Sequence, residues 1–237
     1  MKKNTLLDHN DKSKFIIFNF ETTKFCNAKC PVCFRTRNLE LLKRIKSNHL
    51  SIADFQDFIL NNYDYIKRLS NSEKLITIIK FCGELGDPMM HPNLDDLIRI
   101  SNDVFDRVEI FTNGGLRSNK WVSKMLMQYN KLEFTFGIDG LSEPINNLYR
   151  VNVNTKLALS NMYTSSKIKK TRWDYNIFTH NYHEIKDVIK IKNKFENLLV
   201  NCRFSGKGET KIVDDKLIED CCRMLKDNNI TYYVCPL

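Results

Sequence analysis

Hydrophobic positions along the chain fall into two alternating patterns, short continuous runs and longer segments with the spacing of an amphipathic helix. The run Phe15–Phe20 is typical of a buried strand. The segment after Ser51, a helix-capping residue, carries apolar side chains such as Phe55 and Ile59 on one helical face. By the same criteria we predict strands over Phe15–Phe20, Leu75–Phe81, Arg107–Thr112, Leu132–Ile138, Trp173–Phe178 and Leu198–Phe204, and Ile230–Val234 can form a last short strand. The first predicted helix begins at Ser51. Further helices are predicted over Leu94–Asp103, Ser118–Tyr129, Asn154–Lys167, His183–Phe195 and Asp214–Asp227.

Six strand–helix units in succession imply a parallel sheet with right-handed crossovers. Six units are too few for the usual closed eight-stranded barrel, so we predict an α/β fold, a partial (β/α)6 TIM-like barrel with parallel strands. Residues 1–14 are polar and are predicted to form a flexible tail. Residues 15–237 are predicted to form one core domain with a short C-terminal segment. Ligands of such folds bind at the carboxyl ends of the strands, so chemistry is expected there.

Composition narrows the class of protein only a little. Of the 237 residues 42% are hydrophobic and 27% charged, as in ordinary globular proteins. No apolar run approaches the roughly 20 residues of a membrane helix, and no signal core follows the basic start, so we expect a cytoplasmic protein without a membrane partner. The net charge of +9 suggests an anionic partner such as nucleic acid. A lysine-rich surface is the interpretation we favour.

Three of the eight cysteines are grouped in one predicted loop, with the spacing C-x3-C-x2-C. Cys26, Cys30 and Cys33 can hold three irons of a cubane cluster and leave the fourth iron open for a ligand. A zinc knuckle or plain buried thiols are the alternatives, but zinc usually takes four ligands and no Cys or His pair follows at knuckle spacing. We therefore predict a [4Fe–4S] cluster on these residues.

This loop resembles the signature of the radical S-adenosylmethionine (SAM) superfamily. Together with the motifs described below, the resemblance covers about residues 15–204. The resemblance implies that SAM chelates the open iron through its amino and carboxylate groups. Val32 stands where the family commonly has an aromatic residue, and its backbone is expected to meet the adenine. The chain from Ile177 to Ile185 is similar to a strand–helix junction of members with a C-terminal SPASM extension, and Asn181 is expected to cap that helix.

Other predicted strand ends carry further motifs of the family. The segment with Gly83, Glu84 and Asp87 is similar to its glycine-and-acid motif, whose carboxylate can accept hydrogen bonds from the amino group of SAM. Glu84 and Asp87 are both candidates for that role. Asn113 lies in a Thr-Asn-Gly sequence like one found in many radical SAM enzymes, although an ordinary β-turn explains it equally well.

Two charged residues further on complete the expected SAM site. Asp139 resembles the aspartate often assigned to ribose contact, and Gly137 replaces the serine of that family segment. Arg150 resembles the arginine that pairs with the SAM carboxylate, where it could form a bidentate contact. No catalytic residue beyond these cofactor ligands is assigned.

The resemblance implies an enzyme that cleaves SAM reductively to a 5′-deoxyadenosyl radical, with flavodoxin or ferredoxin as reductant. A peptide or protein is the first expected substrate, and a nucleotide or other small molecule is the second. A non-catalytic Fe–S protein that binds nucleic acid is the alternative from a different class. The SPASM members hold auxiliary clusters in their extension, and this chain ends about where that extension would begin. We expect no auxiliary cluster on Cys202, Cys221, Cys222 or Cys235, because Cys221 and Cys222 are neighbours on a predicted helix.

Overall fold

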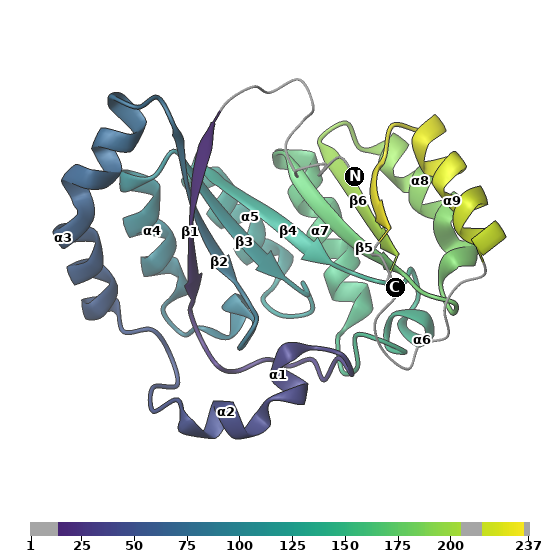
Figure 1. Cartoon of the computed structure of the whole chain (residues 1–237), viewed down its shortest axis with the longest axis horizontal. Helices are drawn as coiled ribbons and strands as arrows, with labels where there is room; N and C mark the ends of the chain where they lie inside the picture. The colour runs from purple at the N-terminus through teal and green to yellow at the C-terminus, as the bar shows by residue number, and fades with distance from the viewer. Residues whose placement is uncertain (1–13, 205–214, 235–237) are drawn as a thin grey trace.

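In the part of the chain that the structure describes, the sheet has seven parallel strands, which follow one another in chain order across it. The structure is a computed structural model that describes residues 14–204 and 215–234 (Figure 1). Most of the predicted tail and Cys235 therefore lie outside the described residues. The strands are β1 (Phe15–Glu21), β2 (Ile76–Cys82), β3 (Arg107–Thr112), β4 (Leu132–Gly137), β5 (Thr171–Ile177), β6 (Leu198–Phe204) and β7 (Thr231–Val234).

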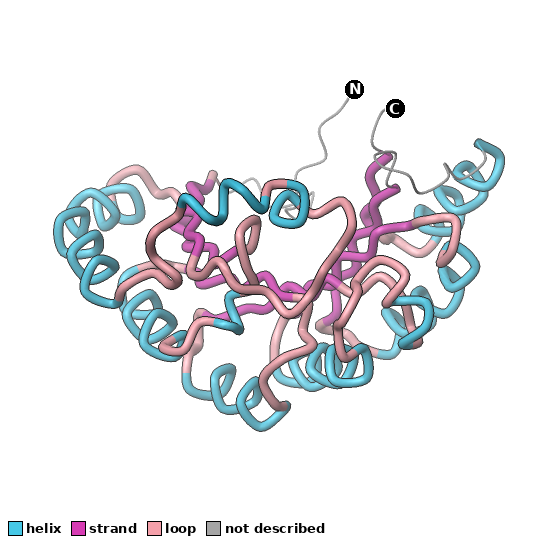
Figure 2. The backbone as a smooth tube through the Cα atoms, turned by 90° about the horizontal axis from the view of Figure 1, so that it is seen from below, coloured by secondary structure: helices cyan, strands magenta, loops and turns pink. Residues whose placement is uncertain are grey.

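Helices cover the outer side of this curled sheet, which is a half-barrel as the sequence predicts (Figure 2). The longer helices are α3 (Ile52–Asn71), α4 (Leu94–Val104), α5 (Asn119–Gln128), α7 (Thr155–Ile168), α8 (Ile185–Lys194) and α9 (Asp215–Asp227). Short helical turns are α1 (Phe34–Arg37), α2 (Leu39–Arg44), α6 (Glu143–Asn146), η1 (Pro88–Met90) and η2 (Tyr182–Glu184). None of the helices in the described ranges is both long and apolar enough to cross a membrane.

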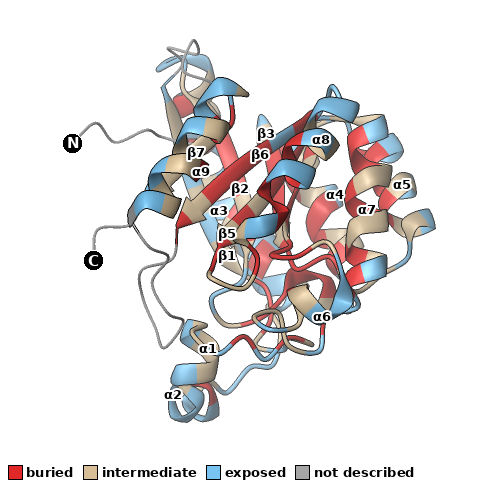
Figure 3. Cartoon of the chain, turned by 90° about the vertical axis from the view of Figure 1, so that its right-hand side faces the viewer, coloured by how far each residue is buried: buried red, intermediate tan, exposed pale blue. Residues whose placement is uncertain are grey.

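The hydrophobic core lies between the sheet and these helices, where Figure 3 shows the buried residues. Phe20 of β1 packs edge-on against Phe55 and Phe58 of α3. The Ser51 side chain caps α3 by accepting a hydrogen bond from the amide of Asp54. Alternate residues of each strand therefore face the helices, and the residues between them line the concave side.

Charged side chains close the concave side near the amino ends of the central strands. Arg172 of β5 donates to Glu109 of β3 at 2.9 Å, and Arg107 lies within ion-pair distance of both Glu109 and Glu133. These groups are largely buried, so each charge needs the opposite charge beside it. Their network leaves the carboxyl ends of the strands as the open, loop-bearing edge.

Candidate cofactor site

The cysteine loop follows β1 at the carboxyl edge of the sheet. Cys30 is buried, Cys26 and Cys33 are partly exposed, and all three thiols are free. The amide of Cys33 donates to the carbonyl of Cys30 at 3.2 Å, and the amide of Lys29 donates to the carbonyl of Val151 at 3.0 Å. The loop is thereby attached to the segment that carries the predicted SAM-binding arginine.

The three thiols fit an iron–sulfur cluster in number and in donor chemistry. Burial, followed by the nearby Asp87 carboxylate, raises the pKa of Cys26 to about 12, and an ionised Cys30 also raises it. Ionised Cys33 likewise raises the pKa of Cys30. Bound iron would offset the cost of ionising these neighbouring thiols, because its positive charge stabilises the thiolates. Across the part of the chain that the structure describes, no three Cys, His, Asp or Glu side chains are already gathered in metal-binding geometry.

The loop after β2 packs directly on the segment that leads into Cys26. The amide of Asp87 donates to the carbonyl of Phe25 at 2.8 Å. A Cβ atom on Gly86 would collide with the carbonyl oxygens of Thr23 and Phe25, so this close approach of two backbones requires glycine. The glycine-and-acid motif thus supports the cysteine loop through the backbone.

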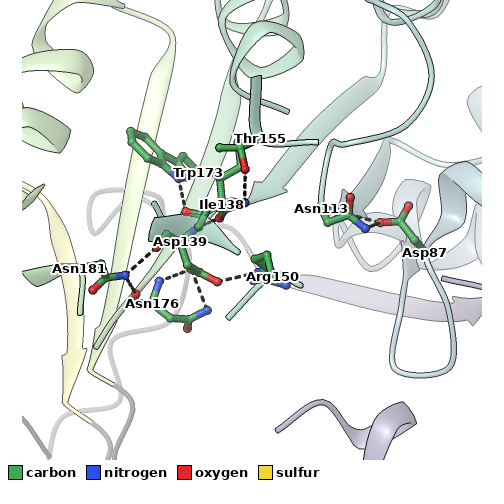
Figure 4. A network of polar contacts seen from close by, with 10 residues as sticks. Asp87, Asn113, Ile138, Asp139, Arg150, Thr155, Trp173, Asn176 and Asn181 are labelled. Carbon is green, nitrogen blue, oxygen red and sulfur yellow. Dashed lines mark hydrogen bonds and ion pairs between the residues drawn. The ribbon is translucent and has the colours of Figure 1, made fainter. Parts of the chain in front are cut away.

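Asp87 is a buried hydrogen-bond acceptor for the next strand end. Its carboxylate accepts from the amide of Met89 and the hydroxyl of Thr112, both at 2.9 Å. It also accepts from the backbone and side-chain amides of Asn113, both at 2.8 Å (Figure 4). Burial raises its pKa, while these donors lower it. With its acceptor sites taken, Asp87 acts here by holding Asn113 in place.

Asn113 connects this pair to the cysteine loop. Its side-chain amide donates to the side chain of Asn27 at 2.8 Å and lies 3.9 Å from the sulfur of Cys26. Its amide oxygen accepts from the amide of Gly115 at 2.9 Å. Asn113 therefore does more than form the β-turn that was the alternative explanation, because it joins the second and third strand ends to the cysteines.

Glu84 is exposed on the same loop, so of the two predicted acids it has the freer carboxylate. The carboxylate of Glu21, the last residue of β1, accepts from the amides of Glu84 at 2.8 Å and Leu85 at 3.1 Å. Gly83 is needed in this turn because a Cβ atom there would collide with the carbonyl of Gly86. The sequence analysis did not identify Glu21. Its place as an acidic residue at the end of the first strand is the signal that could have indicated it.

Asp139 is fully buried beyond the end of β4, where both carboxylate oxygens are occupied. One oxygen accepts from Nε of Arg150 at 2.6 Å, and the other accepts from the backbone amide of Asn176 at 2.6 Å and its side chain at 3.1 Å (Figure 4). A contact from Asp139 to a ribose hydroxyl would require one of these bonds to open. The sequence argument did not include Asn176.

Arg150 lies between Asp139 and the cysteine loop. Burial raises the pKa of Cys30, and the Arg150 guanidinium opposes that rise. The Asp139 carboxylate raises the pKa of Arg150 above its ordinary value despite burial. A Cβ atom on Gly137 would lie only 2.7 Å from Nη2 of Arg150, so glycine in place of the family's serine makes room for the guanidinium.

Asn181 joins the ends of β4 and β5, and the prediction that its side chain caps the following helix is wrong. Its side-chain amide donates to the carbonyls of Asp139 and Asn176, both at 2.8 Å, and its oxygen accepts from the amide of Phe178 at 2.7 Å. The side chain is drawn inward because buried strand-end carbonyls need donors. Asn181 therefore steadies the Asp139–Arg150 pair from behind.

The remaining candidates lie in two places. Val32 is partly exposed on the loop between Cys30 and Cys33, beside the thiols. Cys202 of β6 and Cys221 of α9 are buried in the hydrophobic core, close enough that ionised Cys221 raises the pKa of Cys202. The core, rather than the carboxyl edge of the sheet, is thus the environment of these later cysteines.

Known proteins resemble this chain over part of their length. No protein-family model matches it. The 7,8-dihydro-6-hydroxymethylpterin dimethyltransferase of Methanocaldococcus jannaschii is 32% identical over 139 residues, which are 56% of this chain and 24% of the relative. The chain therefore spans about a quarter of this curated relative.

Solved structures share the fold over nearly the whole chain. SuiB of Streptococcus suis bound to S-adenosylmethionine superposes with a TM-score of 0.64 at 17% identity, over 94% of this chain and 51% of SuiB. A radical SAM methyltransferase from Sphaerobacter thermophilus superposes with a TM-score of 0.63 at 11% identity, over 92% of this chain and 65% of the methyltransferase. The protein anSMEcpe with bound AdoMet superposes with a TM-score of 0.61 at 19% identity, over 92% of this chain and 63% of anSMEcpe. In its fold, this chain is thus similar to parts of these solved proteins, one of which is a radical SAM methyltransferase.

Proposed function

We propose that the chain binds a [4Fe–4S] cluster on Cys26, Cys30 and Cys33, binds SAM beside it, and catalyses reductive cleavage of SAM. The observation that carries this proposal is the convergence at one edge of the sheet. There the cysteine loop contacts the Asp87–Asn113 pair through Asn113 and faces the Asp139–Arg150 pair through Cys30. The solved relatives with bound SAM support the same use of this fold.

The side chains at this edge divide the binding of SAM among them. Arg150, held by Asp139, offers its guanidinium to the carboxylate of SAM. Glu84 offers its exposed carboxylate to the amino group, while the backbones of Val32 and Gly83 shape the pocket. The bound cofactors would supply one-electron cleavage of the C–S bond of SAM to methionine and a 5′-deoxyadenosyl radical that takes a hydrogen atom from the substrate.

A peptide or protein is the substrate class that we propose first. SuiB was solved with its precursor peptide SuiA, and anSMEcpe with the Cp18Cys peptide. A small molecule is the second candidate, because the curated relative is named for a pterin. Flavodoxin or ferredoxin would supply the electron in the cytoplasm, where thiols stay reduced. A screen for mass changes in peptides, pterins and nucleosides, after anaerobic incubation with SAM, separates the substrate classes.

Anaerobic reconstitution tests the proposal itself. The wild-type protein should take up about four irons per chain, as a cubane cluster requires, and should form 5′-deoxyadenosine with dithionite. Changing Cys26, Cys30 and Cys33 to Ala should abolish both the visible absorption and the product. The matched control changes Cys82, Cys221 and Cys222 to Ala and should retain both. A cluster that persists in the first variant would refute the assignment, and a cluster without product would favour a non-catalytic protein.

A further inference from the structure

The net positive charge of this protein is concentrated beside the cysteine loop. Residues 24–46 carry seven basic side chains and one acidic side chain, which gives +6 of the total +9. We refer to residues 24–46 as the basic segment. It comprises the cysteine loop, α1, the whole of α2 and the two residues after α2, and Figures 1 and 3 show α1 and α2 projecting from the sheet.

Some of these charges hold the segment in place. The Lys24 ammonium donates to the carbonyl of Ile45 at 2.9 Å, and Nε of Arg35 donates to the carbonyl of Lys24 at 3.2 Å. Lys43 forms an ion pair with Glu40 at 2.6 Å. The two bonds at Lys24 hold α1 and the end of α2 against the start of the cysteine loop, whereas the Lys43–Glu40 pair lies within α2.

Four other cations of the segment face the solvent. Within residues 14–204 and 215–234, no acidic side chain forms an ion pair with Lys29, Arg37, Arg44 or Lys46, and all four are exposed. Other exposed cations of the described surface are of both kinds: Arg99 and Lys190 have an acid one helical turn away, whereas lysines such as Lys120 and Lys186 form no ion pair. In the basic segment, four cations without an ion pair lie together between residues 29 and 46. The unpaired charges therefore form a positive face whose field reaches about 8 Å at physiological ionic strength.

Exposed apolar side chains lie among these charges. Phe25, Phe34, Leu39 and Leu41 are between 37% and 52% exposed. Basic charge mixed with exposed apolar groups is typical of a surface that steers a partner protein and then packs against it. A nucleic acid would use basic charge together with aromatic stacking, for which Phe25 and Phe34 are available, whereas the exposed aliphatic side chains of Leu39 and Leu41 suit packing against a protein. These features favour an acidic protein as the partner.

We propose that the basic segment is the docking face for an acidic electron-donor protein that reduces the cluster. This inference rests on the proposed function. Cys33 is the residue that precedes α1, so a donor bound to this face would lie next to the cysteines. The step moves one electron and no atoms, because the flavin or Fe–S centre of the donor loses the electron that the cluster gains. Charge attraction raises the rate of such encounters and weakens with added salt.

Charge reversal on the exposed cations tests this docking face. The variant carries Arg37→Glu, Arg44→Glu and Lys46→Glu, and the matched control reverses three exposed lysines of α5 and α8, Lys120, Lys124 and Lys186. The probe is reduced flavodoxin, and the readout is 5′-deoxyadenosine formed by the reconstituted protein. The flavodoxin concentration for half-maximal rate should rise at least about tenfold in the variant alone. The dithionite-driven rate should stay unchanged in both. An equal flavodoxin dependence in variant and wild type would overturn the proposal.

Direct binding separates this inference from the proposed function. If dithionite yields no product from the wild type, reductive cleavage of SAM is refuted, but interferometry with immobilised flavodoxin still measures the docking face. Weaker binding by the variant than by the control supports the face, and equal binding overturns it. Gln substitutions at the same positions serve if the Glu variant does not fold. Tighter binding of bulk tRNA than of flavodoxin through these residues would also overturn the proposal.

Discussion

At the scale of single residues, Arg150 shows how this fold places a charged group beside the cysteine loop. Its guanidinium has a buried carboxylate on one side and a cysteine on the other, and only 20% of its side chain is exposed. A buried ion pair is costly to form, so its value here is geometric, because it fixes one orientation of the guanidinium. The same pair explains why the nearest strand residue is Gly137.

Replacing Arg150 with Ala should weaken SAM binding by about 1.5–3 kcal/mol, the cost of a lost charged hydrogen bond. Calorimetric titration of the reconstituted protein with SAM measures this. The matched control is Arg107→Ala, since Arg107 has a similar exposed fraction but lies near the amino ends of the strands. Unchanged affinity in the Arg150 variant would remove this residue from the SAM site.

A double-mutant cycle decides how Asp139 acts. If it positions Arg150, Asp139→Asn should weaken SAM binding by about 1 kcal/mol in the wild type and add little in the Arg150→Ala background, as expected for coupled residues. If Asp139 contacts the ribose as the family resemblance implies, the two losses should instead add. Circular dichroism must first establish that each variant is folded, because breaking a buried pair is destabilising.

At the scale of elements, the sequence predicted every one of the six main strands to within about two residues at each end, a usual error for such boundaries. Apolar runs locate these strands because both faces of a parallel sheet are largely covered. The short helices α1, α2 and α6 were missed, since four to six residues carry no helical period. The first two of them form the basic segment's outer face, so the missed elements are the ones that the docking proposal needs.

The start of β2 offers a test of element stability and its pH dependence. Asp106 accepts hydrogen bonds from the amide of Thr77 at 2.9 Å, from its hydroxyl at 2.7 Å and from Ser70 at 2.9 Å. Burial would raise its pKa, but these hydrogen bonds outweigh burial and lower it. Asp106→Ala should reduce the free energy of unfolding at pH 7 by about 1–3 kcal/mol, because Thr77 loses its buried acceptor.

The sign of the pH effect follows from the lowered pKa. The ionised carboxylate stabilises the fold above its ordinary pKa of about 4, and this contribution is lost as the pH falls through the folded-state value. Urea unfolding at pH 7 and pH 3 should therefore show a smaller difference between wild type and Asp106→Ala at pH 3. Asp187→Ala, which removes an exposed pair with Lys190, is the control and should change little. A difference of the same size at both pH values would contradict the argument.

At the scale of the whole molecule, the sheet separates two groups of cysteines. Cys26, Cys30 and Cys33 lie at the open edge, whereas Cys202 and Cys221 lie in the core between β6 and α9. Buried cysteines of this kind behave as small apolar residues. The distribution favours one cluster per chain.

Iron analysis tests this prediction. A variant with Cys202, Cys221 and Cys222 changed to Ala should retain about four irons per chain, the same as wild type. Mössbauer spectra of both proteins should then show a single type of cluster. About eight irons in the wild type, reduced by half in the variant, would contradict a single cluster and would group the protein with the multi-cluster branch.

The sequence by itself determined the half-barrel and the cysteine loop, because both are local. A strand is set by a run of apolar residues, and C-x3-C-x2-C places three cysteines within eight positions of one loop. It also supplied the candidates Glu84, Asp87, Asn113, Asp139 and Arg150, through strand ends and family resemblance. It could not assign partners among them, since Asp139 and Asn176 are 37 residues apart in the chain.

Only the tertiary structure decided which candidate side chains are hydrogen-bonded within the protein and which remain exposed. Parallel strands bring distant loops to one edge, and burial there forces each polar atom to find a partner. Asp87 and Asp139 are thereby turned into supports for Asn113 and Arg150, while Glu84 stays exposed. The same fold places the exposed cations Arg37, Arg44 and Lys46 beside the cysteine loop, an arrangement in space that composition alone does not contain.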